Sequence, residues 1–176
     1  GGNERNFTTL DGYRGRLPND EKIILYCTDE ISQSAALNLW TSQEREVLFA
    51  DTVIDSQFLP WLESRHEELK FQRVDAELDA SLKEETPELS DGDGETKSES
   101  LRKLIKDALS NDKVTIQVQA LKSGSNGPAA LILLPEQMRR MNDIGALMDQ
   151  RLPGLPDYHV LLVNQKHPLV EGLLRL

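Results

Sequence analysis

Short apolar runs alternate with helix-length amphipathic segments over the first 78 residues. The apolar runs are Ile23 to Cys27, Val47 to Ala50 and Phe71 to Val74. Each run has the length of a buried strand, and the segments between them carry apolar residues at helical spacing. The pattern predicts a βαβαβ unit, and therefore a small three-stranded parallel sheet with right-handed crossovers.

Two helices are predicted between these strands. The first follows Thr28–Glu30, with Thr28 or Asp29 as its N-cap. We expect it to bury Ile31, Ala35, Leu37 and either Leu39 or Trp40. The second starts near Asp55. Its apolar side chains are Phe58, Leu59, Trp61 and Leu62.

Charge divides the chain into three parts. The net charge is −10, and acidic residues concentrate between Asp75 and Ser100, together with glycine and serine. Such a segment buries too little apolar surface to order itself, so residues 79–100 are predicted to be an acidic linker, with a partner-binding acidic tail as the alternative. No basic stripe interleaved with aromatic residues is present, which argues against nucleic acid as a partner.

A second globular pattern follows the linker. An amphipathic helix is predicted from Leu101 to Leu109, and strands are predicted at 114–118, 129–134 and 160–163. A helix opens at Pro135 and runs to about Arg151, and a last helix opens at Pro168. Residues 101–176 are therefore expected to form an α+β unit. The predicted fold is α/β in class, with the βαβαβ layer followed by this α+β unit.

The helix that opens at Pro135 carries a narrow apolar stripe. All three methionines of the chain lie on it, at Met138, Met141 and Met148. Ile144 widens the stripe, while Leu147 points among charged residues. Methionine adapts to varied apolar surfaces, so the stripe is either a core-facing side or a contact surface for partner proteins.

Other candidate chemistry is weak. Cys27 ends a strand just before a helix, where a thiol can become a nucleophile, but a buried structural role is expected. Asp51 and Asp55 follow the second strand, where a phospho-accepting aspartate would lie, although helix capping and turn formation explain Asp55 more simply. The three histidines show no metal-ligand spacing, so no metal site is expected.

The order and spacing of several strings resemble the heat shock protein 90 chaperone family, in its bacterial branch. The strings are Thr8–Tyr13, Lys22–Tyr26, Thr28–Glu30, Glu46–Phe49, Ile54–Asp55, Phe71–Asp75 and Asn164–Val170. The resemblance implies a fragment. Residues 1–78 would be the small α/β end of the middle domain, and residues 101–176 an incomplete C-terminal domain that lacks the terminal dimerisation helices.

The resemblance also implies a function. The segment would bind partly folded client proteins and relay a movement driven by ATP and magnesium, which bind elsewhere in a homodimeric protein. It would hold no cofactor and no catalytic residue of its own. In the family the corresponding amphipathic helix contacts clients. That assigns client contacts to Met138, Met141, Ile144, Leu147 and Met148, with Arg139 and Arg140 as steering charges.

Several alternatives stay open at this stage. Trp40 and Trp61 either form a second apolar contact patch or lie buried against their own sheet. A phosphoryl-transfer or signalling domain that uses Asp51 or Asp55 is one rival to the chaperone interpretation, and a non-catalytic adaptor is another. No apolar run reaches the roughly 18 residues that span a membrane, and a single cysteine fits a reducing compartment, so a cytoplasmic protein is expected.

Overall fold

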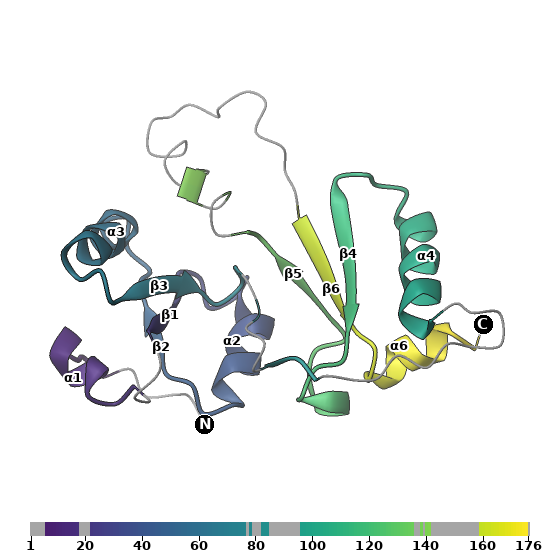
Figure 1. Ribbon diagram of the computed structural model, residues 1–176, viewed down its shortest axis with the longest axis horizontal. Helices are drawn as coiled ribbons and strands as arrows, with labels where there is room; N and C mark the ends of the chain where they lie inside the picture. Colours follow the sequence, from purple (N-terminus) through teal and green to yellow (C-terminus); the bar gives the residue numbers. More distant parts are fainter. Residues whose placement is uncertain are drawn as a thin grey trace.

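Two three-stranded sheets stand side by side with a helix between them in the computed structural model (Figure 1). The structure describes residues 6–17, 22–76, 78, 82–84, 96–135, 138, 140–141 and 159–175. The elements of the first part are α1 (Leu10–Arg14), β1 (Ile23–Cys27), α2 (Ser34–Thr41), β2 (Val47–Phe49), α3 (Asp55–Arg65) and β3 (Lys70–Arg73). Those of the second part are α4 (Lys97–Leu109), β4 (Val114–Gln119), η2 (Gly124–Asn126), β5 (Ala130–Leu133), β6 (His159–Asn164) and α6 (Pro168–Leu173).

The first sheet is parallel throughout and has the order β2-β1-β3, which confirms the predicted βαβαβ unit. The chain leaves β1 in one direction to form β2, then returns past β1 to form β3. Right-handed crossovers in opposite directions place their helices on opposite faces of a sheet. Accordingly, Leu25 and Cys27 of β1 pack in the cluster that contains α2, whereas Ile24 and Tyr26 pack in the cluster that contains α1 and α3.

Helix α2 begins later than the sequence predicts. The Asp29 carboxylate accepts hydrogen bonds from the backbone N–H groups of Ile31 and Ser32. These bonds fold residues 29–33 into turns and lower the pKa of Asp29, with the hydrogen bond from the Ser32 side chain as the largest cause. Because the helix starts only at Ser34, the expected burial of Ile31 and Ala35 is wrong, and both side chains are exposed. Its buried residues are Ala36, Leu37, Leu39 and Trp40.

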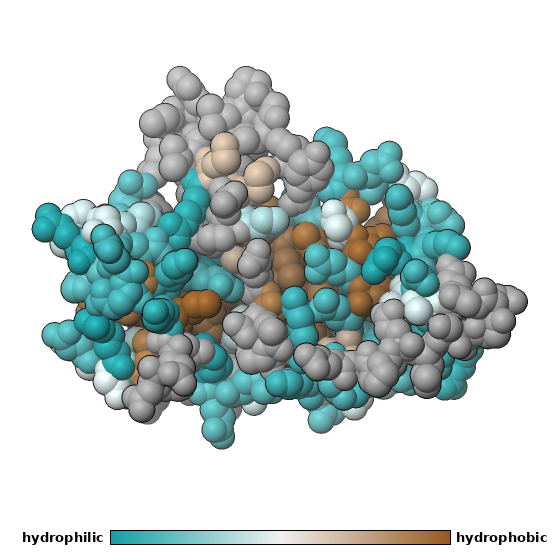
Figure 2. Space-filling view, viewed as in Figure 1, coloured by the Kyte–Doolittle hydropathy of each residue, from teal (hydrophilic) through white to brown (hydrophobic). Residues whose placement is uncertain are grey.

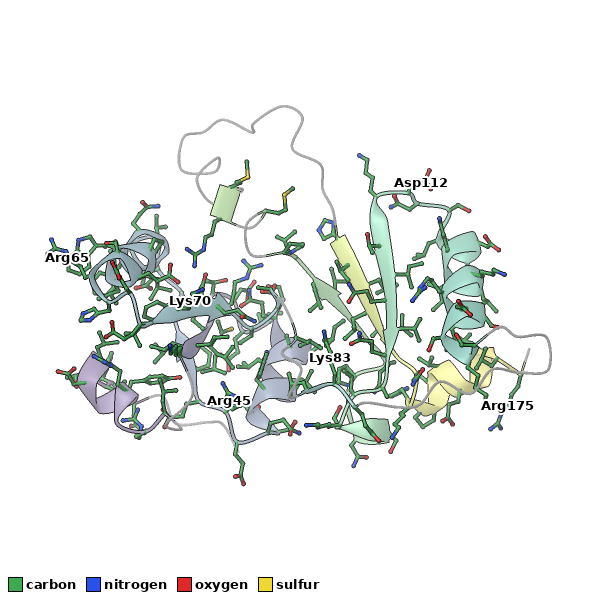
Figure 3. All side chains as sticks on the ribbon, in the orientation of Figure 1. Arg45, Arg65, Lys70, Lys83, Asp112 and Arg175 are labelled. Atoms are coloured by element: carbon green, nitrogen blue, oxygen red, sulfur yellow. The ribbon has the colours of Figure 1, made fainter. Side chains whose placement is uncertain are left out.

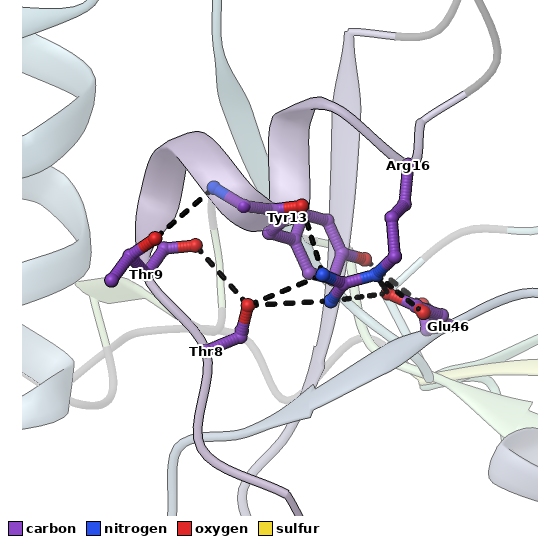
Figure 4. A network of polar contacts seen from close by, with 6 residues as sticks. Thr8, Thr9, Tyr13, Arg16 and Glu46 are labelled. Atoms are coloured by element: carbon purple, nitrogen blue, oxygen red, sulfur yellow. Dashed lines mark hydrogen bonds and ion pairs between the residues drawn. The ribbon is translucent and has the colours of Figure 1, made fainter.

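Helix α1 was not predicted as an element, and a polar network ties it to the first sheet (Figure 4). The Tyr13 hydroxyl donates to the backbone oxygen of Glu46 at 3.1 Å, just before β2. Arg16 binds the Glu46 carboxylate with an Nε–Oε1 distance of 2.9 Å, and its Nη1 donates to the Thr8 hydroxyl at 3.3 Å. The network holds α1 against the start of β2, while Tyr13 itself fills part of the core.

The second sheet is mixed and has the order β4-β6-β5. Strand β6 runs parallel to β4 and antiparallel to β5. All three strands lie where the sequence predicts them, within one residue at each end. One face of this sheet packs against α4 and α6 through the cluster of Leu101, Ile116, Val118, Val163 and Val170.

Helix α4 starts earlier than expected. It begins at Lys97 rather than Leu101, because Thr96 and Glu99 form a capping box in which each side chain accepts the other residue's backbone N–H. The expected acidic linker is described only at residues 82–84 and 96–100. Leu82 is buried in the core, and Lys83 forms an isolated β-bridge with Leu121.

One hydrophobic core cluster is shared by the two sheets. Leu131, Leu133 and Leu162 of the second sheet lie in the same cluster as Leu25 and Cys27 of the first. Helix α2 supplies the middle layer through Ala36, Leu37, Leu39 and Trp40. The second sheet is thus covered on one face by α4 and α6, and on the other by a helix that belongs to the first sheet (Figure 1).

Candidate functional site

The methionine stripe is only partly described by the structure. Met138, Arg140 and Met141 are helical, as the sequence predicts. Met138 is half-buried and Met141 is 41% exposed. The other predicted contacts, Ile144, Leu147 and Met148, and the predicted steering charge Arg139, lie outside the described residues.

Arg140 is engaged within the chain. Its Nη1 lies 2.8 Å from Oε2 of Glu63 on α3, and its Nη2 lies 3.0 Å from Oε1 of the same carboxylate. The same Nη2 donates to the backbone oxygen of Phe71 on β3 at 3.2 Å. Sequence reasoning assigned this charge to partner steering and missed the contact, because Glu63 lies 77 residues away in the chain. The pair fixes the described part of the helix predicted from Pro135, which we call the methionine helix, beside α3 and β3.

The two tryptophans lie in opposite environments. Trp40 is 1% exposed and its indole N–H donates to the backbone oxygen of Val74 at 2.9 Å, so it belongs to the core and not to a surface patch. Trp61 is 51% exposed and stacks on Phe58, with ring centroids 5.7 Å apart. The Arg65 guanidinium lies over the Trp61 ring, 5.3 Å from its centroid.

Exposed apolar side chains form a ridge along α3. Ile54, Phe58 and Trp61 follow one another at helical spacing, and all three are exposed; we call them the α3 ridge. Leu59 and Leu62, on the neighbouring face of the helix, pack into the core instead. The sequence analysis grouped Phe58 and Trp61 with these leucines. The helix has apolar residues on two sides, however, and the sheet covers only one of them.

The carboxyl edge of the first sheet carries a polar network that sequence reasoning did not find. Gln33 is buried, and its Oε1 accepts the backbone N–H of Thr28 at 2.9 Å. Its Nε2 donates to the Asp75 carboxylate, which also forms an ion pair with Arg73. Cys27, at the same edge, is fully buried as predicted, and burial raises the pKa of its thiol. These groups satisfy one another, so the edge is closed by internal bonds.

The two candidate aspartates do not converge on a reactive group. The Asp55 carboxylate accepts the backbone N–H of Thr52 at 2.9 Å and the Thr52 hydroxyl at 2.7 Å, which is the turn-forming role that the sequence favours. Asp51 follows β2, an edge strand, whereas the central strand β1 ends in Cys27. Among the described residues, no group of three or more histidine, cysteine or acidic side chains is placed to hold a metal ion.

A shallow groove of about 480 Å³ lies between α2 and the loop after β4. Asn38, Ser42 and Gln43 line it from α2, and Ser123 and Asn126 from the loop. The fully buried Asn164 shapes this loop, because its amide donates to the backbone oxygen of Gly124 at 2.9 Å and accepts the N–H of Leu121 at 3.3 Å. The residues that line the groove are uncharged and include no catalytic combination.

Two other features bear on the class of protein. Within the described part of the chain, no helix has the length and apolar character needed to cross a membrane. The space-filling view shows apolar surface between polar regions, including pale apolar patches at the top of the molecule (Figure 2). The fold and its surfaces thus define an α/β protein that exposes apolar side chains on its helices.

Comparison with known proteins identifies the family. The model of the family described as "Hsp90 protein" matches residues 2–176. "Chaperone protein HtpG" of Porphyromonas gingivalis is 32% identical over 181 residues, which cover 94% of this chain and 26% of the relative. The proteins of that name from Bacteroides fragilis and Bacteroides thetaiotaomicron are 29% and 28% identical, and in each the match covers 86% of this chain and 23% of the relative.

The chain belongs to the Hsp90 family, and its relatives are bacterial chaperones. This confirms the resemblance drawn from the strings between Thr8 and Val170. The chain spans about a quarter of the length of the curated relatives that it matches.

Proposed function

We propose that this segment holds partly folded client proteins on apolar side chains of two neighbouring helical pieces. The first piece is the methionine helix, with contacts at Met138, Met141, Ile144, Leu147 and Met148. The second is the α3 ridge, which includes Trp61. Arg139 supplies a steering charge for acidic partners.

One observation carries the proposal. Apolar side chains stay exposed on both pieces, with Met141 on one and the Phe58–Trp61 stack on the other. The Arg140–Glu63 pair joins these pieces although they lie far apart in the chain. Flexible methionine and broad aromatic rings suit partners of varied apolar surface. Membership of a chaperone family supports the same interpretation.

The wider setting is part of the proposal. We infer that the whole protein is a cytoplasmic homodimer that binds ATP and magnesium outside this segment. The segment then has no catalytic residue of its own. Its role is to relay the nucleotide-driven movement that arises in domains outside this segment, and the core shared by the two sheets supports such mechanical coupling.

The test is suppression of aggregation. A chemically unfolded model client is diluted into buffer with the segment, and light scattering is followed. We expect the segment to lower scattering, and the variant Met138→Ser/Met141→Ser or Phe58→Ser/Trp61→Ser to lose most of this effect while its far-ultraviolet circular dichroism is unchanged.

A matched control separates a specific surface from general stickiness. Ile132→Ser and Leu169→Ser also remove exposed apolar side chains, but on β5 and α6. We expect these variants to protect the client as the unmodified segment does. The proposal is contradicted if the control variants lose as much protection as the surface variants do. It is also contradicted if the unmodified segment does not protect the client.

A further inference from the structure

The groove between α2 and the loop after β4 is lined by side-chain amides that the fold does not use. Asn38 and Gln43 line it on the α2 side and Asn126 on the loop side, and we call it the amide groove. Within the described part of the chain, none of these three amide groups makes a hydrogen bond, whereas the buried amides of Gln33 and Asn164 are both engaged. The three groups are exposed and therefore accessible to a ligand.

A hydroxyl group at the same groove also lacks a partner. The Oγ atom of Ser123 is buried, and no described residue forms a hydrogen bond with it. Buried polar atoms nearly always have a hydrogen-bond partner, so an unpaired one indicates a place where a ligand or water is held. Ser123 belongs to the lining, which places this unpaired atom at the wall of the amide groove.

Both walls of the amide groove are held in place by the fold. On the α2 side, Leu39 packs in the shared core, and the neighbouring Trp40 donates to the backbone oxygen of Val74 at 2.9 Å. On the loop side, the buried Asn164 donates to the backbone oxygen of Gly124 at 2.9 Å. The walls lie next to each other at the lower side of the molecule, where α2 faces η2 (Figures 1 and 3). A ligand would therefore enter a site that is already formed, which lowers the cost of ordering it.

The lining residues define the chemistry of the ligand. None of them is charged, so the groove offers no counter-ion to a phosphate, a carboxylate or an ammonium group. None is aromatic, so a nucleobase finds no ring on which to stack. Each amide instead presents both a donor and an acceptor, which is the pair of groups that a peptide bond presents. Apolar surface for small side chains comes from Ala35, Leu39 and Pro128.

We propose that the amide groove binds a short, extended and uncharged peptide segment through its main-chain groups. Asn38 and Gln43 on one wall and Asn126 on the other exchange hydrogen bonds with the N–H and C=O groups of the segment, as a neighbouring strand would. Because α2 belongs to the first part of the chain and the loop to the second, the bound segment bridges the two parts. The amide groove shares no residue with the methionine helix or the α3 ridge, so its failure would leave the proposed function untouched.

The test is a titration with the capped peptide acetyl-Thr-Val-Ser-Val-Thr-amide, followed by NMR of the side-chain amide groups. The same peptide with an N-methylated backbone keeps the side chains but loses the main-chain donors, and maltose is the neutral sugar probe. The variant Asn38→Ala/Asn126→Ala removes one amide from each wall. Gln57→Ala is the matched control, because it removes an exposed amide from α3, outside the lining.

We expect the peptide to shift the side-chain amide resonances of Asn38, Gln43 and Asn126. Its Kd should rise about tenfold in Asn38→Ala/Asn126→Ala and stay unchanged in Gln57→Ala, and the N-methylated peptide should bind about tenfold more weakly. The proposal is overturned if these resonances do not shift, if both variants bind alike, or if the N-methylated peptide or maltose binds as tightly as the peptide. If the double variant does not fold, the comparison of the three probes on the unmodified protein decides.

Discussion

Arg140 and Trp61 show how the functional meaning of one side chain depends on a distant neighbour. Each stands on a helix whose existence the local pattern predicts. The partner of Arg140 is Glu63, and the exposure of Trp61 depends on which side of α3 the sheet covers. Neither fact is contained in local spacing. Sequence reasoning therefore finds the candidate surface residues but not which charge is already used or which tryptophan is buried.

Cys27 gives a prediction at the same scale. Burial raises the pKa of its thiol above the ordinary value of 9.0, so the folded state favours the neutral thiol. The contribution of the neutral thiol to the stability of the folded state is fully present below pH 9.0, and it is lost as pH rises through the higher folded-state pKa. We expect the free energy of unfolding to fall more steeply in wild-type protein than in Cys27→Ala between about pH 8 and pH 10. Denaturant titrations at each pH measure it.

The comparison with Cys27→Ala removes the contribution of lysine and tyrosine, which titrate in the same range in both proteins. Parallel pH profiles for the two proteins would show that the thiol titrates alike in the folded and unfolded chain. That result would contradict the burial argument.

The positions of the strands follow closely from the hydrophobic pattern of the sequence. Strand β1 lies where the run Ile23–Cys27 places it, and the order of the first sheet follows from the alternation of strands and helices. Helix starts are less accurate, because side chains decide them. Asp29 closes a turn before α2, while Thr96 and Glu99 extend α4 by one turn.

The cap of α4 yields a prediction at this scale. Thr96 satisfies the N–H of Glu99, and alanine at an N-cap typically costs about 1 kcal/mol. We expect Thr96→Ala to lower the free energy of unfolding by about this amount, whereas Thr96→Ser keeps the hydroxyl and most of the stability. Denaturant unfolding followed by circular dichroism measures both. Equal stability of Thr96→Ala and wild type would mean that the box adds nothing to α4.

The molecule as a whole is joined more tightly than its sequence indicates. The charge pattern divides the chain, yet Leu131 and Leu162 of the second sheet pack with α2 of the first. Apolar patterning tells that a strand face is buried, but not which element buries it. The shared core is therefore a property of the tertiary structure that the local patterns leave open.

Truncation of Leu131 tests whether the shared core couples the two sheets. Truncating a buried leucine typically costs about 2–5 kcal/mol. We expect Leu131→Ala to destabilise both sheets, so that tryptophan fluorescence, which reports on α2 and α3, shifts together with circular dichroism. The neighbouring Ile132 is 65% exposed, and Ile132→Ala should change stability by less than about 0.5 kcal/mol. Separate transitions by the two probes would show that the sheets unfold independently.

The position of α2 between the two sheets also governs how the chain folds during synthesis. Its apolar face is translated early, but the strands that cover part of it, β5 and β6, leave the ribosome only after more than half of this segment has been made. Until then, Leu37, Leu39 and their neighbours lack the second sheet as a covering surface. A nascent chain with such apolar surface is prone to aggregation, so this piece of a chaperone family would itself need protection while it is being translated.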